Sequence, residues 1–130
     1  MADIILADDE PGVLDSIQGC LESAHHRVRT AMHGGEVFEL VQQQVPDIVI
    51  TDIIMPGVEG IETIVRLRRA HPDLKILAIS GGGQFGRVGY LDAASDLGAN
   101  GVLAKPFSMN KLFDSLAELG IDSAIPTTWA

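Results

Sequence analysis

Short apolar segments recur along the chain at regular intervals, and β-branched residues are frequent in them. They cover residues 4–7, 28–31, 48–51, 76–80 and 101–104. Each segment is apolar almost throughout, whereas a half-exposed strand would alternate apolar and polar residues. A continuous apolar run is typical of strands that are buried on both faces of a parallel sheet. The pattern therefore predicts five such strands.

Between these segments, apolar residues recur at the three- and four-residue spacing of a helix face. The five stripes are Val13, Leu14, Ile17, Leu21 and Ala24; Val37, Leu40 and Val41; Ile61, Ile64, Val65 and Leu67; Val88, Leu91, Ala94 and Leu97; and Leu112, Phe113 and Leu116. Pro11 suits the first turn of the first helix, and Ser108 suits the N-cap of the last one.

The strict alternation of strand and helix predicts an α/β fold. Parallel strands joined by right-handed helical crossovers give a doubly wound sheet, a (βα)5 sandwich of three layers. A length of 130 residues with 46% hydrophobic residues accommodates one domain with a substantial core. We expect the domain to cover residues 1–120 and residues 121–130, which include Pro126, to form a C-terminal tail.

Charge and composition narrow the classes of partner. Nine Lys and Arg residues against 18 Asp and Glu give a net charge of −9. Such a surface repels phosphate backbones and anionic lipids, so neither nucleic acid nor membrane is expected as a partner. One cysteine excludes an internal disulfide framework. The first residues lack a basic segment followed by a long apolar one, so no signal peptide is predicted and a cytoplasmic location is expected.

Polar side chains stand where four of the five predicted strands end. The first strand is followed by Asp8, Asp9 and Glu10, the third by Asp52 and the fifth by Lys105, while the fourth ends in Ser80. Ligands of doubly wound sheets bind at the carboxyl ends of the strands. The sequence thus predicts a functional site at this end of the sheet.

In the flavodoxin-like strand order 2-1-3-4-5, the first and third strands are neighbours, which brings Asp8, Asp9 and Asp52 into one crevice. Carboxylates so close together need a cation or a raised pKa. A donor set of oxygen atoms favours a hard cation, above all Mg²⁺, which commonly binds carboxylates together with phosphate oxygens. Lys105 lies two strands from Asp52, roughly 10 Å away, a gap that its side chain could largely cover. Together with Ser80 it could bind phosphoryl oxygens, with Asp52 as the nucleophile.

Together, these residues resemble a known family. Asp8-Asp9-Glu10-Pro11, Asp52-Ile53-Ile54-Met55-Pro56-Gly57, Ser80 and Lys105-Pro106-Phe107 look like the motifs of a response-regulator receiver domain of the chemotaxis-regulator type. The resemblance covers residues 2–120, and the order of these motifs at successive strand ends is far more specific than any one of them. The strand order 2-1-3-4-5 is taken from this resemblance, since this family is a standard example of that order.

The resemblance implies a role for each site residue. Asp52 would accept a phosphoryl group from the phosphohistidine of a sensor histidine kinase or phosphotransfer protein. Asp9, Asp52 and the backbone carbonyl of Ile54 would bind Mg²⁺ directly, and Asp8 would bind it through water. Ser80 and Lys105 would contact the phosphoryl group, and the Lys105-Pro106 bond would be cis. Phosphorylation would then change a face that binds a downstream protein, and hydrolysis would end the signal.

Two departures from the family pattern affect the expected switch. Val102 stands where family members often carry an aromatic residue that moves inward on phosphorylation. The segment between Ser80 and Lys105 is longer than the family pattern suggests, and it contains Gly81-Gly82-Gly83. We expect residues 81–90 to be mobile without phosphate and ordered with it, with Phe85 or Tyr90 in place of the missing aromatic residue.

Three other functions compete with this interpretation. A receiver-like module that binds partners without phosphorylation would normally lose one of the acidic residues or the lysine. A phosphatase of the haloacid-dehalogenase type would need an Asp-x-Asp motif and a larger chain. A flavin carrier would need a phosphate-binding first loop and more aromatic residues than four Phe, one Tyr and one Trp. We therefore expect a phosphoacceptor signalling domain, not an enzyme that acts on other substrates.

Overall fold

Strands and helices alternate in the computed structural model, which describes residues 1–53, 60–80 and 98–124. The strands are β1 (Asp3–Ala7), β2 (Arg27–Ala31), β3 (Ile48–Asp52), β4 (Lys75–Ser80) and β5 (Gly101–Ala104). The helices are α1 (Pro11–Ser23), α2 (Gly34–Gln43), α3 (Gly60–Ala70) and α5 (Met109–Glu118). All five strands and these four helices lie where the hydrophobic pattern predicts them. The expected helix with the Val88–Leu97 stripe is outside the described residues.

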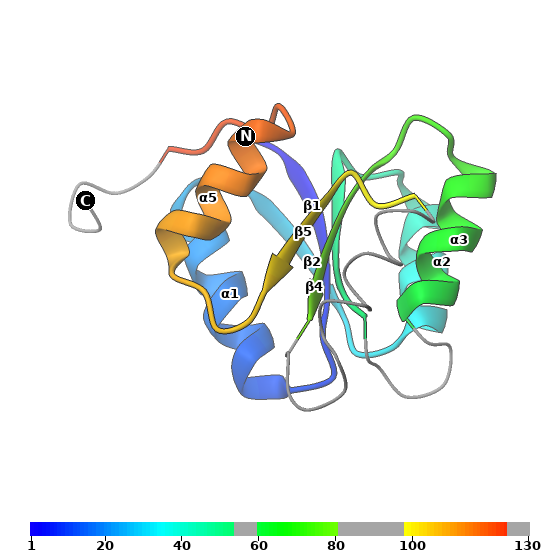
Figure 1. Ribbon diagram of the computed structural model, residues 1–130, viewed down its shortest axis with the longest axis horizontal. Helices are drawn as coiled ribbons and strands as arrows, with labels where there is room; N and C mark the ends of the chain where they lie inside the picture. Colours follow the sequence, from blue (N-terminus) through cyan, green and yellow to red (C-terminus); the bar gives the residue numbers. More distant parts are fainter. Residues whose placement is uncertain (54–59, 81–97, 125–130) are drawn as a thin grey trace.

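The five strands form one parallel sheet in the order β2-β1-β3-β4-β5. In Figure 1, α1 and α5 cover one face of this sheet, and α2 and α3 cover the other. The predicted doubly wound, flavodoxin-like sandwich of three layers is therefore confirmed. Because the strands are parallel and in register, they all end at the same side of the sheet, which we call its carboxyl end; the opposite side is its amino end.

The core lies on both faces of the sheet, which explains why its strands are continuously apolar. Successive residues of a strand point to opposite faces. Leu6 packs with Leu21 of α1 and Phe113 of α5, whereas its neighbour Ile5 packs with Val37 of α2. Leu6 and Ile5 are both fully buried.

The helix ends follow from local sequence. Pro11 occupies the first turn of α1, and the Ser108 hydroxyl accepts a hydrogen bond from the Lys111 amide at 3.1 Å, as predicted for an N-cap. The exposed His33 caps α2, because its Nδ1 accepts a bond from the Glu36 amide at 3.4 Å. A sequence search for N-caps that considers only Ser, Thr, Asp and Asn misses this one.

Two helices end in the same chain reversal, which determines where the residues that follow them lie. His25 (φ 67°) follows α1 and Gly120 (φ 84°) follows α5. The next amide donates back to the last turn of each helix, from His26 to Leu21 and from Ile121 to Leu116. This is the Schellman pattern, which directs the residue after the left-handed one toward its own helix.

His26 and Ile121 are therefore buried, at 4% and 6% exposure. The neighbouring His25, by contrast, is exposed. Residues 121–124, expected as the start of a tail, pack on the domain, since Ile121 belongs to the core and the Ala124 amide bonds the Ala24 carbonyl at 3.3 Å.

Candidate functional site

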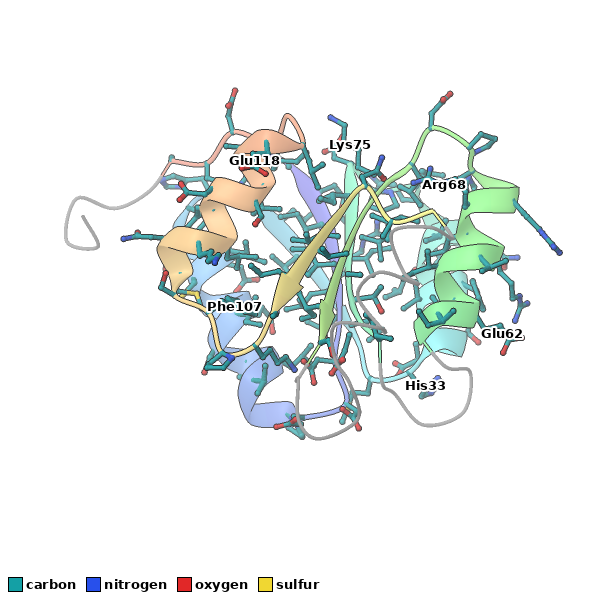
Figure 2. The ribbon with its side chains drawn as sticks, viewed as in Figure 1. His33, Glu62, Arg68, Lys75, Phe107 and Glu118 are labelled. Carbon is teal, nitrogen blue, oxygen red and sulfur yellow. The ribbon has the colours of Figure 1, made fainter. Side chains whose placement is uncertain are left out.

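The carboxyl end of the sheet gathers the polar residues that the sequence places at strand ends. Asp8 directly follows β1, Asp52 ends β3, Ser80 ends β4 and Lys105 directly follows β5. Asp8, Asp52 and Ser80 are almost completely buried, at 0%, 4% and 1% exposure. In Figure 2 the labels Phe107 and His33 mark this end of the molecule, and Lys75 marks the amino end. Burial of two carboxylates is costly unless each is paired, so their partners define the site.

Lys105 is the partner that the two buried carboxylates share. Its Nζ lies 2.7 Å from Oδ2 of Asp8 and 3.3 Å from Oδ2 of Asp52. The backbone aims it, because the Lys105 amide donates to the Ser80 carbonyl at 2.8 Å and the Lys105-Pro106 bond is cis, as the resemblance implies. The side chain of Lys105 therefore does cross from β5 to β3.

Electrostatics keep this lysine charged. Burial of the ammonium would by itself lower the pKa of Lys105, but the hydrogen bond that it donates to Asp8 and the charges of Asp52 and Asp8 outweigh this effect and raise the pKa above its ordinary value. The lysine is thus a fixed cation at neutral pH. A fixed cation beside a carboxylate can accept the additional negative charge of a phosphoryl group without reorganisation.

Asp8 is held at both carboxylate oxygens. Its Oδ1 accepts a hydrogen bond from the Glu10 amide at 3.0 Å, and its Oδ2 accepts one from Lys105. The backbone turn that follows β1 therefore sets the orientation of Asp8. The same turn brings carboxylate oxygens of Asp8, Asp9 and Glu10 within 4.8 Å of one another.

This acidic cluster, Asp8 with Asp9 and Glu10, fits a hard divalent cation. Its donors are all carboxylate oxygens, and they range from buried in Asp8 to exposed in Glu10, so an ion could enter from solvent. Oxygen donors of this kind suit Mg²⁺, which keeps several of its waters. Sequence reasoning assigned Asp8, Asp9, Asp52 and Ile54 to the metal and left out Glu10, although the run of three acidic residues was a visible signal. Ile54 lies outside the described residues.

Two residues that sequence reasoning missed fix the backbone of Asp52. The Thr51 hydroxyl donates to the Asp52 carbonyl at 3.0 Å. The first residue of α3, Gly60, donates its amide to the Ile53 carbonyl at 2.8 Å. A Cβ atom at Gly60 would collide with the carbonyl of Asp52 and the backbone of Ile53. The chain thus closes tightly behind Asp52, and only a residue without a side chain permits this approach.

An open apolar groove of about 700 Å³ adjoins the charged residues. It runs between α1 and the segment that follows β5, and its lining includes Val13, Ile17, Phe107 and Met109 together with Lys105. The groove therefore presents an apolar surface directly beside the paired carboxylates.

Val102, at the position where the family often has an aromatic residue, is 39% exposed on β5. Residues 81–97, on which the expectation of a mobile glycine-rich loop rests, lie outside the described residues. That expectation stays a prediction.

Comparisons with known proteins agree with this geometry. A family model, the response regulator receiver domain, matches residues 4–117. The chain belongs to this family, the receiver domains of two-component signal transduction.

Curated relatives carry the same domain within longer proteins. The chain is 34% identical over 122 residues to the uncharacterized transcriptional regulatory protein YesN of Bacillus subtilis, covering 92% of this chain and 32% of that protein. It is 32% identical over 117 residues to the response regulator MprA of Mycolicibacterium vanbaalenii, covering 89% of this chain and 49% of that protein. The chain thus spans about a third to a half of the length of these relatives.

Solved structures show the same fold at full length of the domain. The receiver domain of NtrX from Brucella abortus matches with a TM-score of 0.83 and 28% identity, over 92% of this chain and 98% of that one. A receiver domain protein from Clostridium thermocellum matches with a TM-score of 0.83 and 26% identity, over 91% and 93% of the two chains. Within the part of the chain that the structure describes, no helix has the length and apolar character needed to span a bilayer.

Proposed function

We propose that this domain accepts a phosphoryl group on Asp52 in a Mg²⁺-dependent reaction and changes its protein-binding surface as a result. The observation that carries the proposal is the position of Lys105, whose Nζ lies within 3.3 Å of carboxylate oxygens of both Asp8 and Asp52. The fold and family support a phosphoacceptor role, and the buried carboxylate paired with a fixed cation supports Asp52 as the acceptor.

The chemistry is a transfer between two nucleophiles. A carboxylate oxygen of Asp52 attacks phosphorus while the bond from phosphorus to the donor's imidazole nitrogen breaks, so the imidazole leaves with the bonding electron pair. Mg²⁺, held by the acidic cluster and Asp52, would neutralise charge on the phosphoryl oxygens. Lys105 contributes a second positive charge, and the Ser80 hydroxyl donates a hydrogen bond. Later attack of water on phosphorus restores the Asp52 carboxylate.

The groove beside Lys105 supports a protein as the phosphodonor. A sensor histidine kinase or phosphotransfer protein that packs apolar side chains against Val13, Ile17 and Phe107 would bring its phosphohistidine next to Asp52. Among the relatives, the sensor kinase CckA of Brucella abortus is 31% identical over 120 residues, which cover 91% of this chain and 12% of that protein. We also propose a cytoplasmic location for this chain, as the sequence predicts.

The downstream partner is proposed to be a protein. The net charge of −9 disfavours nucleic acid as a direct ligand of this domain. One relative, NtrC of Azospirillum brasilense, is named a DNA-binding transcriptional regulator, and this chain matches 25% of its length at 31% identity. The absence of a nucleic-acid partner therefore stays a prediction.

The test is intact-mass spectrometry after incubation with acetyl phosphate. We expect wild type to gain one phosphoryl group in the presence of Mg²⁺, and to gain none after Mg²⁺ is chelated. Asp52→Asn should gain none in either condition. Asp47→Asn, at the amino end of the sheet, is the matched control and should react as wild type does.

Equal incorporation by Asp52→Asn would overturn the assignment of the acceptor. A wild type that neither gains the group nor binds a beryllofluoride mimic would favour a module that binds partners without phosphorylation.

A further inference from the structure

His26 joins three segments of the chain that are distant in sequence. It follows α1, its Nδ1 lies 3.1 Å from the Ala2 amide nitrogen, and its Nε2 lies 2.7 Å from Oγ of Ser123. Ala2 precedes β1, and Ser123 lies in the segment that follows α5. The ring is thus buried between the N-terminal segment and the segment by which the chain leaves the last helix.

These contacts require one protonation state of the ring. The Ala2 amide can only donate, so Nδ1 must accept and carries no proton. The single proton of the neutral ring is then on Nε2, which donates it to the Ser123 hydroxyl. A second proton could be added only at Nδ1, where it would replace the bond from Ala2 and place a charge in a buried position.

We propose that His26 is an acid-sensitive clasp, which holds residues 121–124 against the N-terminal segment and releases them when Nδ1 is protonated. The proposal is independent of phosphoryl transfer, because the clasp lies at the amino end of the sheet and Asp52 at the carboxyl end. The held segment is attached by two further contacts, the bond from the Ala124 amide to Ala24 and the buried side chain of Ile121.

The charges around the ring favour the neutral state. Burial lowers the pKa of His26 from its ordinary value of 6.5, and the N-terminal ammonium and His25 lower the pKa further. Two other charged residues lie on the segments next to the ring. The Arg27 side chain donates a hydrogen bond to the Gln44 side chain at 3.0 Å, and Asp122 is exposed to solvent.

The direction of the pH effect follows. In the released state His26 has an ordinary pKa and binds a proton more readily than in the clasped state. Acidification below pH 6.5 therefore favours release, by up to tenfold for each pH unit, until the clasped ring itself is protonated. At neutral pH the clasp is closed.

Release would change the surface at the amino end of the sheet as well as the position of residues 121–124. Ile121 and Asp122 line a hollow of about 710 Å³ at the amino end, together with Leu74 and Lys75. Loss of the clasp would uncover the apolar residues of this hollow. The proposed outcome of acidification is thus a domain with an altered exit path for its C-terminal segment and a more apolar amino end.

The test is amide hydrogen exchange of the whole chain, followed by NMR between pH 5 and 8 and expressed as protection factors. For wild type we expect the protection of the Ala124 amide to fall by up to tenfold per pH unit below 6.5, while the amide of Ile5 in β1 keeps its protection. In His26→Gln, which cannot titrate, this pH dependence should disappear. His25→Asn is the control, because Asn tolerates the left-handed conformation, and it should keep the dependence.

A flat profile in wild type, or the same slope in His26→Gln, would overturn the proposal. Ser123→Ala gives a second test that leaves the buried ring in place, should His26→Gln fail to fold. We expect it to reduce the protection of the Ala124 amide several-fold at pH values above 6.5. Unchanged protection there would also contradict the clasp.

Discussion

Polar side chains at the amino end of the sheet bond mainly the backbone, whereas the carboxyl end holds two buried carboxylates that share one lysine. At the amino end, side chains satisfy the backbone: Asp47 accepts from the Asp3 amide at 2.8 Å, the Asn100 side chain accepts from the Ile76 amide at 2.8 Å, and Arg68 donates to the Gly98 carbonyl at 2.7 Å. At the carboxyl end, charged side chains contact one another. Lys105 bonds Asp8 and Asp52 directly.

This difference separates stability from function. A side chain that bonds the backbone has its hydrogen-bonding capacity used by the fold, and it gains nothing from an added ligand. The described carboxyl end instead pairs Asp8 and Asp52 with Lys105 and places the carboxylates of Asp9 and Glu10 close to that of Asp8. An excess of negative charge in a partly buried site lowers stability by itself and raises affinity for a cation. The carboxyl end is thus the end at which ligands should change the protein.

The largest effect on stability is expected at Gly60, where the backbone at the carboxyl end leaves no space for a side chain. Gly60→Ala places a methyl group against the backbone of Asp52 and Ile53, so β3 or α3 must move. We expect the free energy of unfolding to fall by about 3 kcal/mol, as for severe overpacking. Urea denaturation measures it. Gly19→Ala, on α1 with no atom within 4 Å of the added Cβ, is the control and should gain about 0.5–1 kcal/mol from its higher helix propensity. Equal effects of the two changes would contradict the tight closure behind Asp52.

Removal of the shared cation should have the next largest effect. Lys105→Met removes the cation that two buried carboxylates share, and we expect a loss of about 2 kcal/mol at neutral pH, less than for a fully buried pair because solvent reaches the lysine. Lys75→Met, at the amino end, should change stability by less than about 0.5 kcal/mol. Thermal or urea unfolding of both variants gives the comparison.

The pH dependence of the same pair has a defined sign. Because the pKa of Lys105 is raised above 10.5, the folded state holds its proton more tightly than the unfolded state. The stabilisation is fully present below pH 10.5 and is lost as the pH rises through the raised pKa. Lys105→Met should lack this alkaline loss. If Lys105→Met and Lys75→Met were equally stable at neutral pH, the charge pairing at the carboxyl end would contribute nothing.

The smallest of the three effects is stabilisation by the cation itself. At a Mg²⁺ concentration about ten times its Kd, wild type should gain about 1.4 kcal/mol, since the ion binds only the folded state. Asp9→Asn, within the acidic cluster, should lose most of this gain, whereas Asp47→Asn at the amino end should keep it. The unfolding midpoints of wild type and the two variants, measured at increasing Mg²⁺ concentrations, give the comparison. A gain that is the same in Asp9→Asn would place the ion elsewhere.

The sequence by itself determined the elements and the end of the sheet at which the polar residues of the candidate site gather. Strands buried on both faces need continuous apolar runs, and helices that cover a sheet need a stripe, so both patterns are local and visible. Parallel strands also end on one side, which is why Asp8, Asp52, Ser80 and Lys105 could be grouped before any contact was known. The strand order does not follow from a local sequence pattern, and it was taken from the resemblance to the family.

Tertiary structure decided what depends on close approach and on chain reversal. The requirement for glycine at position 60 arises only because α3 begins against the carbonyl of Asp52. The sequence does not indicate how closely these two segments approach in space. The burial of His26 depends on the positive φ of His25, a conformation that is uncommon for residues other than glycine and that the sequence therefore did not indicate. The hydrophobic pattern of a helix or strand depends only on which of its faces packs against the core, so it is visible in the sequence. The requirement for glycine at position 60 and the burial of His26 depend on how packed elements contact one another, so they are not.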